Sequence, residues 1–157
     1  MTKQQICCFI GHRNLPKDKE HDIILKLEAE IKSLIKKGVT QFRMGCARGF
    51  DTLAALTVLK LKYKYEGISL NLVIPCLNQT KGWSDEDIAK YNYILNHSDK
   101  INTQIIEFKE NCMEERNRKL VNGSGYCIAF LMHDFGDTFY TVNYAKSQKV
   151  EIINIAK

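Results

Sequence analysis

The sequence predicts an α/β fold, a three-layer α/β/α sandwich with a mostly parallel sheet of about six strands. Two observations predict this class. Short apolar segments alternate with longer segments of helical periodicity along the whole chain, and the strand-like segments are continuously apolar. Strands that are buried on both faces have this composition, because helices cover both sides of a parallel sheet. We therefore expect a Rossmann-like arrangement in one domain, residues 1–157.

The expected strands are short apolar runs that end at glycine, proline or polar residues. In chain order they are residues 5–10, 39–44, 70–74, 101–108, 126–132 and 150–155. The first ends at Gly11 and the third at Pro75, residues that interrupt a strand. The fourth run mixes polar with apolar residues and is the least regular of the six.

The expected helices place apolar residues three and four positions apart. In chain order they are residues 19–37, 51–65, 84–95, 111–121 and 138–147. Gly38 ends the first helix as a C-cap, and Asp51 or Thr52 can cap the second. The run from Ser84 to Asp87 resembles a capping box at the start of the third. Helices thus follow strands in the order that a parallel sheet requires.

Composition limits the functions that the chain can have. The net charge of +5, from 23 basic and 18 acidic residues, suits an anionic ligand without requiring nucleic acid. No apolar run approaches the length of a membrane-spanning helix, and no targeting signal is evident. Six cysteines without a CxxC pair, and no histidine pair at zinc spacing, indicate a reduced cytoplasmic setting. We expect neither a metal site nor a resident cofactor.

Ligands of open parallel sheets bind outside the carboxyl ends of the strands, so the loops after the strands hold the candidate residues. After the first strand come Gly11, His12 and Arg13. Glycine admits a close backbone approach, and the planar guanidinium group suits phosphate or carboxylate. The alternative is a simple turn glycine beside a solvated arginine.

The loop after the second strand reads Gly45-Cys46-Ala47-Arg48-Gly49-Phe50-Asp51 and leads into a helix. Two glycines four residues apart allow backbone N–H groups to point inward, and a helix N-terminus adds partial positive charge. The loop lacks the GK[ST] of a Walker motif and does not read GxGxxG. Arg48 between the glycines favours an anion site over the alternative, a tight turn capped by Asp51.

Two further loops carry candidate residues. Pro75 and Gln79 follow the third strand, and Trp83, the only tryptophan, can stack on a base or sugar or cover a helix end. Before the last helix, Gly136-Asp137-Thr138 offers a flexible turn, a hydroxyl group and helix-start amides. It is a second candidate phosphate cradle or a plain capped helix. The same rule places both glycine loops on one face of the sheet.

Taken together, these motifs resemble the YpsA-like branch of the SLOG superfamily, Rossmann-like proteins related to the DNA-processing protein DprA/Smf and to the LOG phosphoribohydrolases. The shared markers span residues 8–155: Cys8 to Arg13, Gly45 to Thr52, Ile74-Pro75-Cys76 with Gln79 and Trp83, Cys112-Met113 with Arg116-Asn117, and Gly136 to Thr138 with Thr141-Val142 and Tyr144-Ala145. The resemblance implies a pocket for a nucleotide or nucleotide-derived small molecule, lined also by Arg116, Asn117 and Thr141. Related proteins often pair as homodimers.

Two departures from the family pattern affect the expected chemistry. The second glycine loop of the family usually reads Gly-Gly-Thr, and here Asp137 stands in the middle. Its carboxylate would oppose a phosphate unless it points away or holds a ribose hydroxyl. The LOG enzymes carry a glutamate three residues after the threonine, where this chain has Thr141. This difference argues against glycoside hydrolysis of the LOG kind.

The leading hypothesis is a sensor or sequestering protein for a nucleotide derivative. The amides of residues 45–49 and 136–138 would hold phosphates, and Arg13 and Arg48 would supply charge.

Two alternatives remain open. An enzyme that cleaves or transfers at an N-glycosidic bond of a nucleotide, as a hydrolase or transferase, would need an acid–base group beside the scissile bond. The candidates are Asp51, Asp137, His12 and His133. Single-stranded DNA binding in the manner of DprA would need a basic groove with stacking aromatics. The lysine–aromatic stretch at residues 60–65 lies at a helix end away from the strand tips, so nucleic acid is the weakest of the three.

Overall fold

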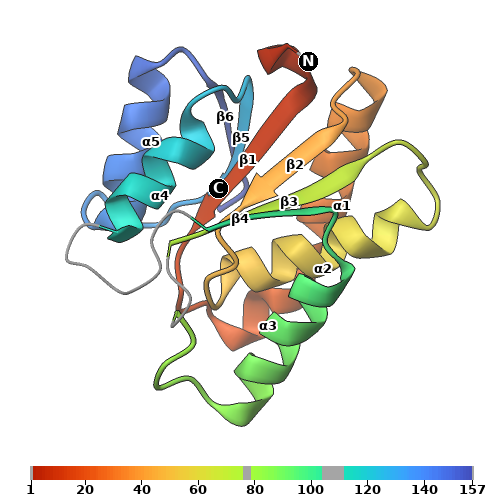
Figure 1. Cartoon of the computed structure of the whole chain (residues 1–157). Helices are drawn as coiled ribbons and strands as arrows, with labels where there is room; N and C mark the ends of the chain where they lie inside the picture. The colour runs from red at the N-terminus through yellow and green to blue at the C-terminus, as the bar shows by residue number, and fades with distance from the viewer. Residues whose placement is uncertain (1, 76–78, 104–111, 157) are drawn as a thin grey trace.

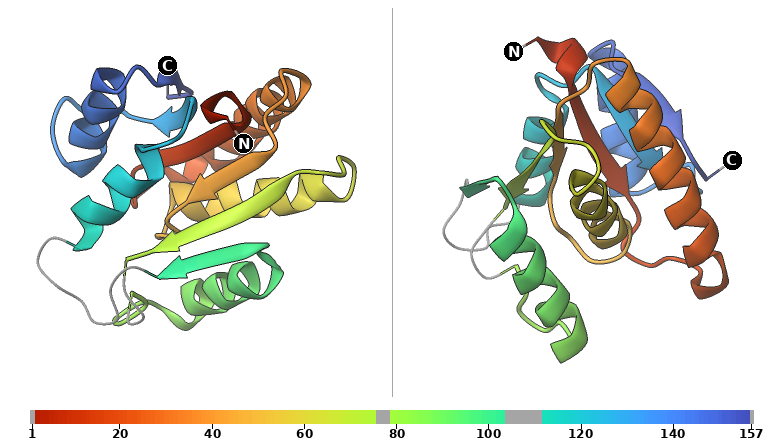
Figure 2. Two further views of the ribbon diagram at one scale, coloured as in Figure 1. Left: turned by 45° about the horizontal axis from the view of Figure 1, so that its top comes forward. Right: turned by 90° about the vertical axis from the view of Figure 1, so that its right-hand side faces the viewer.

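The computed structural model describes residues 2–75, 79–103 and 112–156. Within these residues, six parallel strands form one sheet in the order β4-β3-β2-β1-β5-β6. The strands are β1 (Ile6–Gly11), β2 (Gln41–Met44), β3 (Ser69–Ile74), β4 (Lys100–Thr103), β5 (Tyr126–Phe130) and β6 (Glu151–Asn154). The left view of Figure 2 shows this order across the sheet. The predicted α/β class is confirmed, and within the described residues the sheet is entirely parallel.

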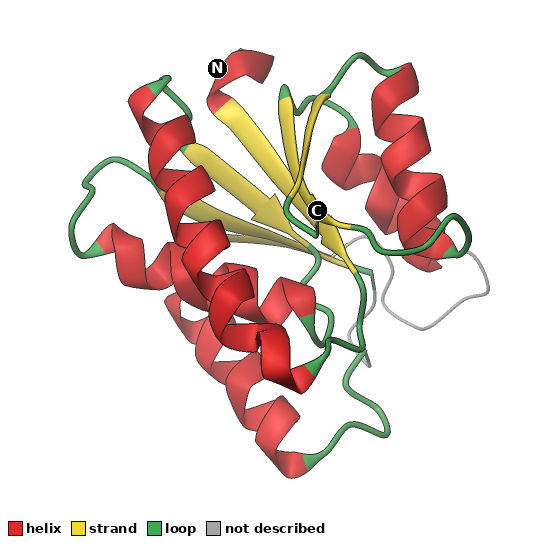
Figure 3. Ribbon diagram, turned by 180° about the vertical axis from the view of Figure 1, so that it is seen from behind, coloured by secondary structure: helices red, strands yellow, loops and turns green. Residues whose placement is uncertain are grey.

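In the described ranges, five α-helices cover the sheet. They are α1 (Glu20–Lys36), α2 (Phe50–Lys62), α3 (Asp85–His97), α4 (Cys112–Val121) and α5 (Asp137–Ser147). Helices α1, α2 and α3 lie on one face, and α4 and α5 lie on the other (Figures 1 and 3). Each face has its own buried apolar cluster, so the sheet is the middle of three layers.

The helix sequences explain these positions. Helix α1 buries a single stripe, Ile23, Leu27, Ile31 and Leu34, because only one of its sides faces the sheet. Helix α2 is buried on several sides, since it packs between α1 and α3 as well as against β1 and β3. No helix in the described ranges is long and apolar enough to cross a membrane.

The strand order reverses at β1. The chain runs outward from β1 through β2, β3 and β4, and then returns to place β5 on the other side of β1. The carboxyl ends of β1 and β5 therefore flank the crevice where open α/β sheets bind ligands. Beneath this crevice, Phe50 at the start of α2 stacks on Phe130 of β5, with ring centroids 6.0 Å apart. A Cβ atom on Gly11 would lie 2.3 Å from the Phe50 ring, so only glycine fits there.

Most elements lie within two or three residues of their predicted bounds, and the differences with a structural cause or consequence are at α2, β5 and β4. Helix α2 begins after Gly49, which is its N-cap, and not after a cap at Asp51 or Thr52. Strand β5 ends at Phe130, two residues early, because the next amide, on Leu131, donates to the Asn154 side chain. Strand β4 covers residues 100–103, and residues 104–108 of the predicted strand lie outside the described residues.

Candidate functional site

A cleft lies outside the carboxyl ends of the strands, at the reversal of strand order. It consists of two adjoining cavities of about 370 and 360 Å³, here called the first and second chambers. Arg13, Ala47 and Met113 line both. The first chamber lies between the loops after β1 and β5, and the second lies toward the segment that precedes α3. Each has the size of a small-molecule site.

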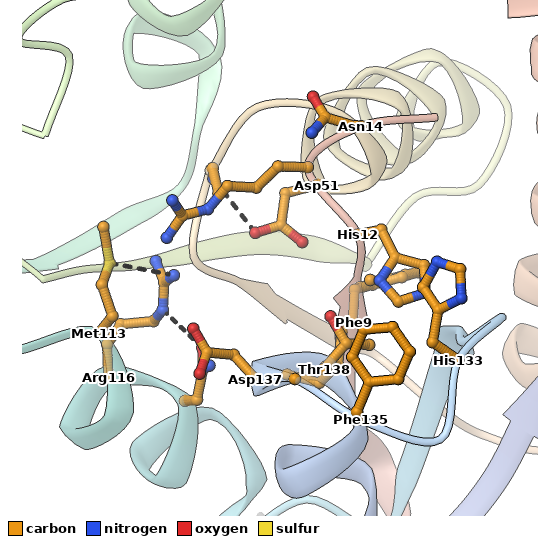
Figure 4. A pocket seen from close by; sticks show the side chains of 16 residues that line it. Phe9, His12, Asn14, Asp51, Met113, Arg116, His133, Phe135, Asp137 and Thr138 are labelled. Carbon is orange, nitrogen blue, oxygen red and sulfur yellow. Dashed lines mark hydrogen bonds between the residues drawn. The ribbon is translucent and has the colours of Figure 1, made fainter. Parts of the chain in front are cut away.

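The Arg116 side chain extends from α4 into the first chamber, where it is only 4% exposed (Figure 4). Its Nη1 donates to the Gly45 carbonyl oxygen (2.7 Å), and its Nε donates to Asn117 Oδ1 (2.9 Å). The remaining nitrogen, Nη2, contacts the Met113 sulfur at 3.7 Å. No carboxylate oxygen of the described residues lies within 4 Å of the guanidinium group. Arg116 is therefore a buried cation held by neutral acceptors.

Gly45 makes room for this arginine. A Cβ atom at residue 45 would lie 1.9 Å from Nη1 of Arg116. Its carbonyl oxygen also accepts a hydrogen bond from the Gln79 side chain. Gly45 lines neither chamber, so its part in the site is to admit and orient Arg116.

Asp51 occupies the floor of the first chamber as a buried carboxyl group. Its Oδ2 accepts a hydrogen bond from the Ala47 amide (3.1 Å). Burial raises the pKa of Asp51 to about 6, against the opposing effects of Arg116 and of the Ala47 amide. Burial also lowers the pKa of Arg116, and the nearby Asp51 carboxylate partly offsets this effect.

These contacts alter the expected phosphate cradle of residues 45–49. The Ala47 amide is bonded to Asp51, and the Phe50 amide at the start of α2 donates to the His12 carbonyl oxygen (3.1 Å). Gly49 lies outside both chambers and has a φ of +79°, and a Cβ atom there would lie 2.2 Å from the Arg13 carbonyl oxygen. The loop supplies side chains to the cleft, while the Ala47 and Phe50 amides donate their hydrogen bonds within the protein.

The second glycine loop faces the first chamber more directly. Gly136, Asp137 and Thr138 all line it, and Gly136 is the N-cap of α5 with a φ of +92°. The first N–H groups of a helix have no partner within it, so this end of α5 favours an anion. Thr141 lies outside both chambers. Its hydroxyl group donates to the Asp137 carbonyl oxygen and accepts from Asn117 Nδ2 (3.2 Å), joining α5 to α4.

An aromatic wall, formed by His12, His133 and Phe135, closes the opposite side of the first chamber (Figure 4). The His133 and Phe135 rings stack with centroids 5.1 Å apart, and the His12 ring lies 5.0 Å from that of His133. His12 Nε2 accepts the Met132 amide hydrogen (2.9 Å), and burial followed by the charge of His133 lowers the pKa of His12. A neutral His12 thus carries its proton on Nδ1.

Phe135 was missed by the sequence analysis. It is 70% exposed, and its ring stacks on that of His133 in the aromatic wall of the first chamber. Its position in a loop after a strand, beside a helix-starting glycine, was the signal that could have identified it.

Arginine and tryptophan side chains form one wall of the second chamber. The Arg48 guanidinium carbon lies 5.4 Å from the centre of the Trp83 ring, and both residues line the chamber with Gln79 and Lys81. Trp83 also meets Tyr91 of α3 edge-on at 5.5 Å, so it both packs on a helix and faces the cleft. Pro75 is buried and lines neither chamber. The described part of the chain contains no cluster of metal-ligating side chains.

The structure thus gathers most of the predicted residues around one cleft. Those that line a chamber are Gly11, His12, Arg13, Ala47, Arg48, Asp51, Gln79, Trp83, Arg116, Asn117, Gly136, Asp137 and Thr138. The four that do not are Gly45, Gly49, Pro75 and Thr141. Gly45 packs against the Arg116 side chain, and Gly49 packs against the backbone of Arg13.

The model of the YspA SLOG family (YpsA) matches residues 10–155 of this chain. The chain belongs to the YspA SLOG family. Among curated proteins, this SLOG chain is 30% identical over 73 residues to a UPF0398 protein of Staphylococcus saprophyticus and 35% identical over 72 residues to one of Halalkalibacterium halodurans. Each match covers 46% of this chain, and 39% and 38% of the two relatives respectively. The matched region is thus well under half of either relative's length.

Two solved structures have the same fold as this SLOG chain. DNA processing protein A from Helicobacter pylori, described with a single-stranded DNA binding mode, superposes with a TM-score of 0.66 over 96% of this chain and 64% of its own. DprA from Streptococcus pneumoniae superposes with a TM-score of 0.62 over 93% and 48%. Both are 16% identical to this chain, so the likeness shows the fold alone.

Proposed function

We propose that this SLOG protein binds a nucleotide or nucleotide-derived small molecule in the cleft, as a sensor or a sequestering protein. The observation that carries the proposal is the Arg116 guanidinium group, which is buried in the first chamber. No carboxylate oxygen of the described residues lies within 4 Å of it, and the nearby Asp51 offsets the effect of its burial only in part. A buried charge is unfavourable unless an opposite charge accompanies it. A phosphate group of a ligand would supply that charge.

Other groups of the first chamber support an anionic ligand. Arg13 lines both chambers, and the N-terminus of α5 adds partial positive charge at Gly136. The aromatic wall beside these groups suits a planar ring, since Phe135 is exposed and stacked on His133. A phosphate joined to a nucleoside combines both kinds of group.

A second candidate function rests on Asp51. Its carboxyl group lines the first chamber, and its pKa of about 6 suits a proton donor near neutral pH. Cleavage at an N-glycosidic bond of the bound nucleotide would use such a group. Thr141, at the position of the LOG glutamate, lies outside the chambers and offers no second acid–base group.

Thermal unfolding with pyrophosphate, ADP, ADP-ribose, NAD and cyclic dinucleotides tests the proposal. A ligand at 100 times its Kd adds about 2.7 kcal/mol to the free energy of unfolding, which raises the Tm by several degrees. Arg116→Met should abolish the shift. Arg118→Met is the matched control, because Arg118 lies on the same helix, exposed and packed over Tyr144, outside both chambers.

Chromatography of each stabilising compound then separates the two functions. A ligand recovered intact supports binding alone, whereas a ligand recovered as base and sugar phosphate supports catalysis, which Asp51→Asn should remove. The absence of any shift across the panel would refute the nucleotide site. A shift with single-stranded oligonucleotides alone, steeply weakened by salt, would favour nucleic acid instead.

A further inference from the structure

The side-chain amide of Gln79 is buried, and one of its two polar atoms has no hydrogen-bond partner among the described residues. The residue is 6% exposed, and its Nε2 lies 3.4 Å from the Gly45 carbonyl oxygen and 3.5 Å from that of Cys46. Its Oε1 is buried and has no hydrogen-bond partner in the part of the chain that the structure describes. Buried acceptors in folded proteins are almost always paired, so an unpaired one calls for an explanation.

The two carbonyl oxygens fix which way the Gln79 amide points. If its oxygen and nitrogen were exchanged, Oε1 would face the carbonyl oxygens of Gly45 and Cys46, and both contacts would become repulsive. Nε2 must therefore stay on that side. The group of Gln79 that stays unused is therefore an acceptor, Oε1.

The surroundings of Gln79 indicate which donor would reach it. Gln79 lines the second chamber, and an occupant of that chamber is a neighbour able to supply a hydrogen atom. The Arg48 guanidinium group and the Trp83 indole ring together form one wall of the same chamber. Flat guanidinium and indole groups favour a planar ring over a flexible polar chain.

We propose that the second chamber holds a nucleobase with an exocyclic amino group, such as adenine, and that Gln79 Oε1 accepts a hydrogen bond from this amine. The inference rests on the proposed function, because it assumes that the phosphate of the same ligand lies beside Arg116 in the first chamber. Arg13, Ala47 and Met113 line both chambers, so one molecule can occupy the two. Gln79 is then a specificity-determining residue of the site.

The test compares three probes by titration calorimetry: ADP, the purine riboside 5′-diphosphate that lacks only the 6-amino group, and pyrophosphate. The intact protein should bind ADP about tenfold more tightly than the analogue without the amine, the effect of one hydrogen bond to a buried acceptor. Gln79→Met should weaken ADP about tenfold and the analogue less than twofold. Pyrophosphate binding should not change. Gln148→Met, the same substitution at an exposed glutamine beyond α5, is the control.

The outcomes separate this inference from the proposed function. Equal affinity for ADP and the analogue, or ADP binding no tighter than pyrophosphate, would overturn the role of Gln79 while the anion site stands. A tenfold loss with 2′-deoxy-ADP instead would assign the donor to the ribose and overturn the base assignment. Failure of all three probes to bind would overturn this inference, and together with no Tm shift across the whole nucleotide panel it would overturn the proposed function as well. The comparison of probes on the intact protein holds even if Gln79→Met does not fold.

Discussion

Substituting Asp51 with asparagine should make the protein more stable at neutral pH. The pKa of this carboxyl group rises from 3.8 to about 6 on folding, because it is buried. Between these values the folded state retains a proton that the unfolded state has released. Stability contributed by the neutral carboxyl group is therefore complete below about pH 4 and is lost as the pH rises to about 6. The difference of about 2 pH units corresponds to about 3 kcal/mol.

Asparagine preserves the shape of the group and its acceptor for the Ala47 amide, but never ionises. We expect Asp51→Asn and the wild type to have similar free energies of unfolding near pH 4. The variant should be more stable by about 3 kcal/mol at pH 8, with the change complete by about pH 7. Urea denaturation at several pH values measures this difference directly. Asp137→Asn, which removes an exposed carboxylate of the same chamber, is the control.

Two outcomes would refute this reasoning. If the difference between Asp51→Asn and the wild type were the same at pH 4 and pH 8, ionisation of Asp51 would not be linked to folding. If the variant were the less stable protein at pH 8, the attraction between Asp51 and Arg116 would outweigh the desolvation of the carboxylate.

Two further predictions concern glycines that pack against arginines of the cleft. Gly49→Ala should destabilise the fold by more than about 2 kcal/mol in urea denaturation, since it adds a backbone clash with Arg13 to an unfavourable φ. Gly82→Ala, with a similar φ of +84° and open space around it, should lose only about 1 kcal/mol, and equal losses would contradict the clash. Gly45→Ala should displace Arg116 and abolish the pyrophosphate-induced Tm shift. An undiminished shift would show that Arg116 does not hold the anion.

The fold was predictable from the sequence because its signals are local. The inner strands β1, β3 and β5 are mostly apolar runs and each helix is an amphipathic or apolar segment, so the order of elements follows largely from neighbouring residues. The end of β5 was misplaced because its cause is distant: Asn154 takes the Leu131 amide, which lies 23 positions away. Nothing in the run from Tyr126 to Met132 encodes that contact.

The candidate site was predictable in place but less so in detail. Ligands of open parallel sheets bind outside the carboxyl ends of the strands, and residues from several of the loops at these ends do line one cleft. The pattern of two glycines could not reveal that the Ala47 amide is bonded to Asp51, or that Gly45 is pressed against an arginine 71 positions later. Likewise, the unpaired end of Gln79 depends on where two carbonyl oxygens lie in space. These are properties of packing, which a linear motif does not contain.

The pairing of β1 with β5 affects how the nascent chain matures on the ribosome. Strand β1 is made first but is an inner strand of the final sheet, and its pairing with β5 joins residues 7–11 to residues 126–130. Until β5 emerges, β1 is an open edge able to pair with a wrong strand. The first chamber cannot form before β1 pairs with β5, because the loops after both strands line it. A ligand bound there would therefore hold an early-made strand of the sheet to a late-made one, and would recognise only chains whose synthesis has passed β5.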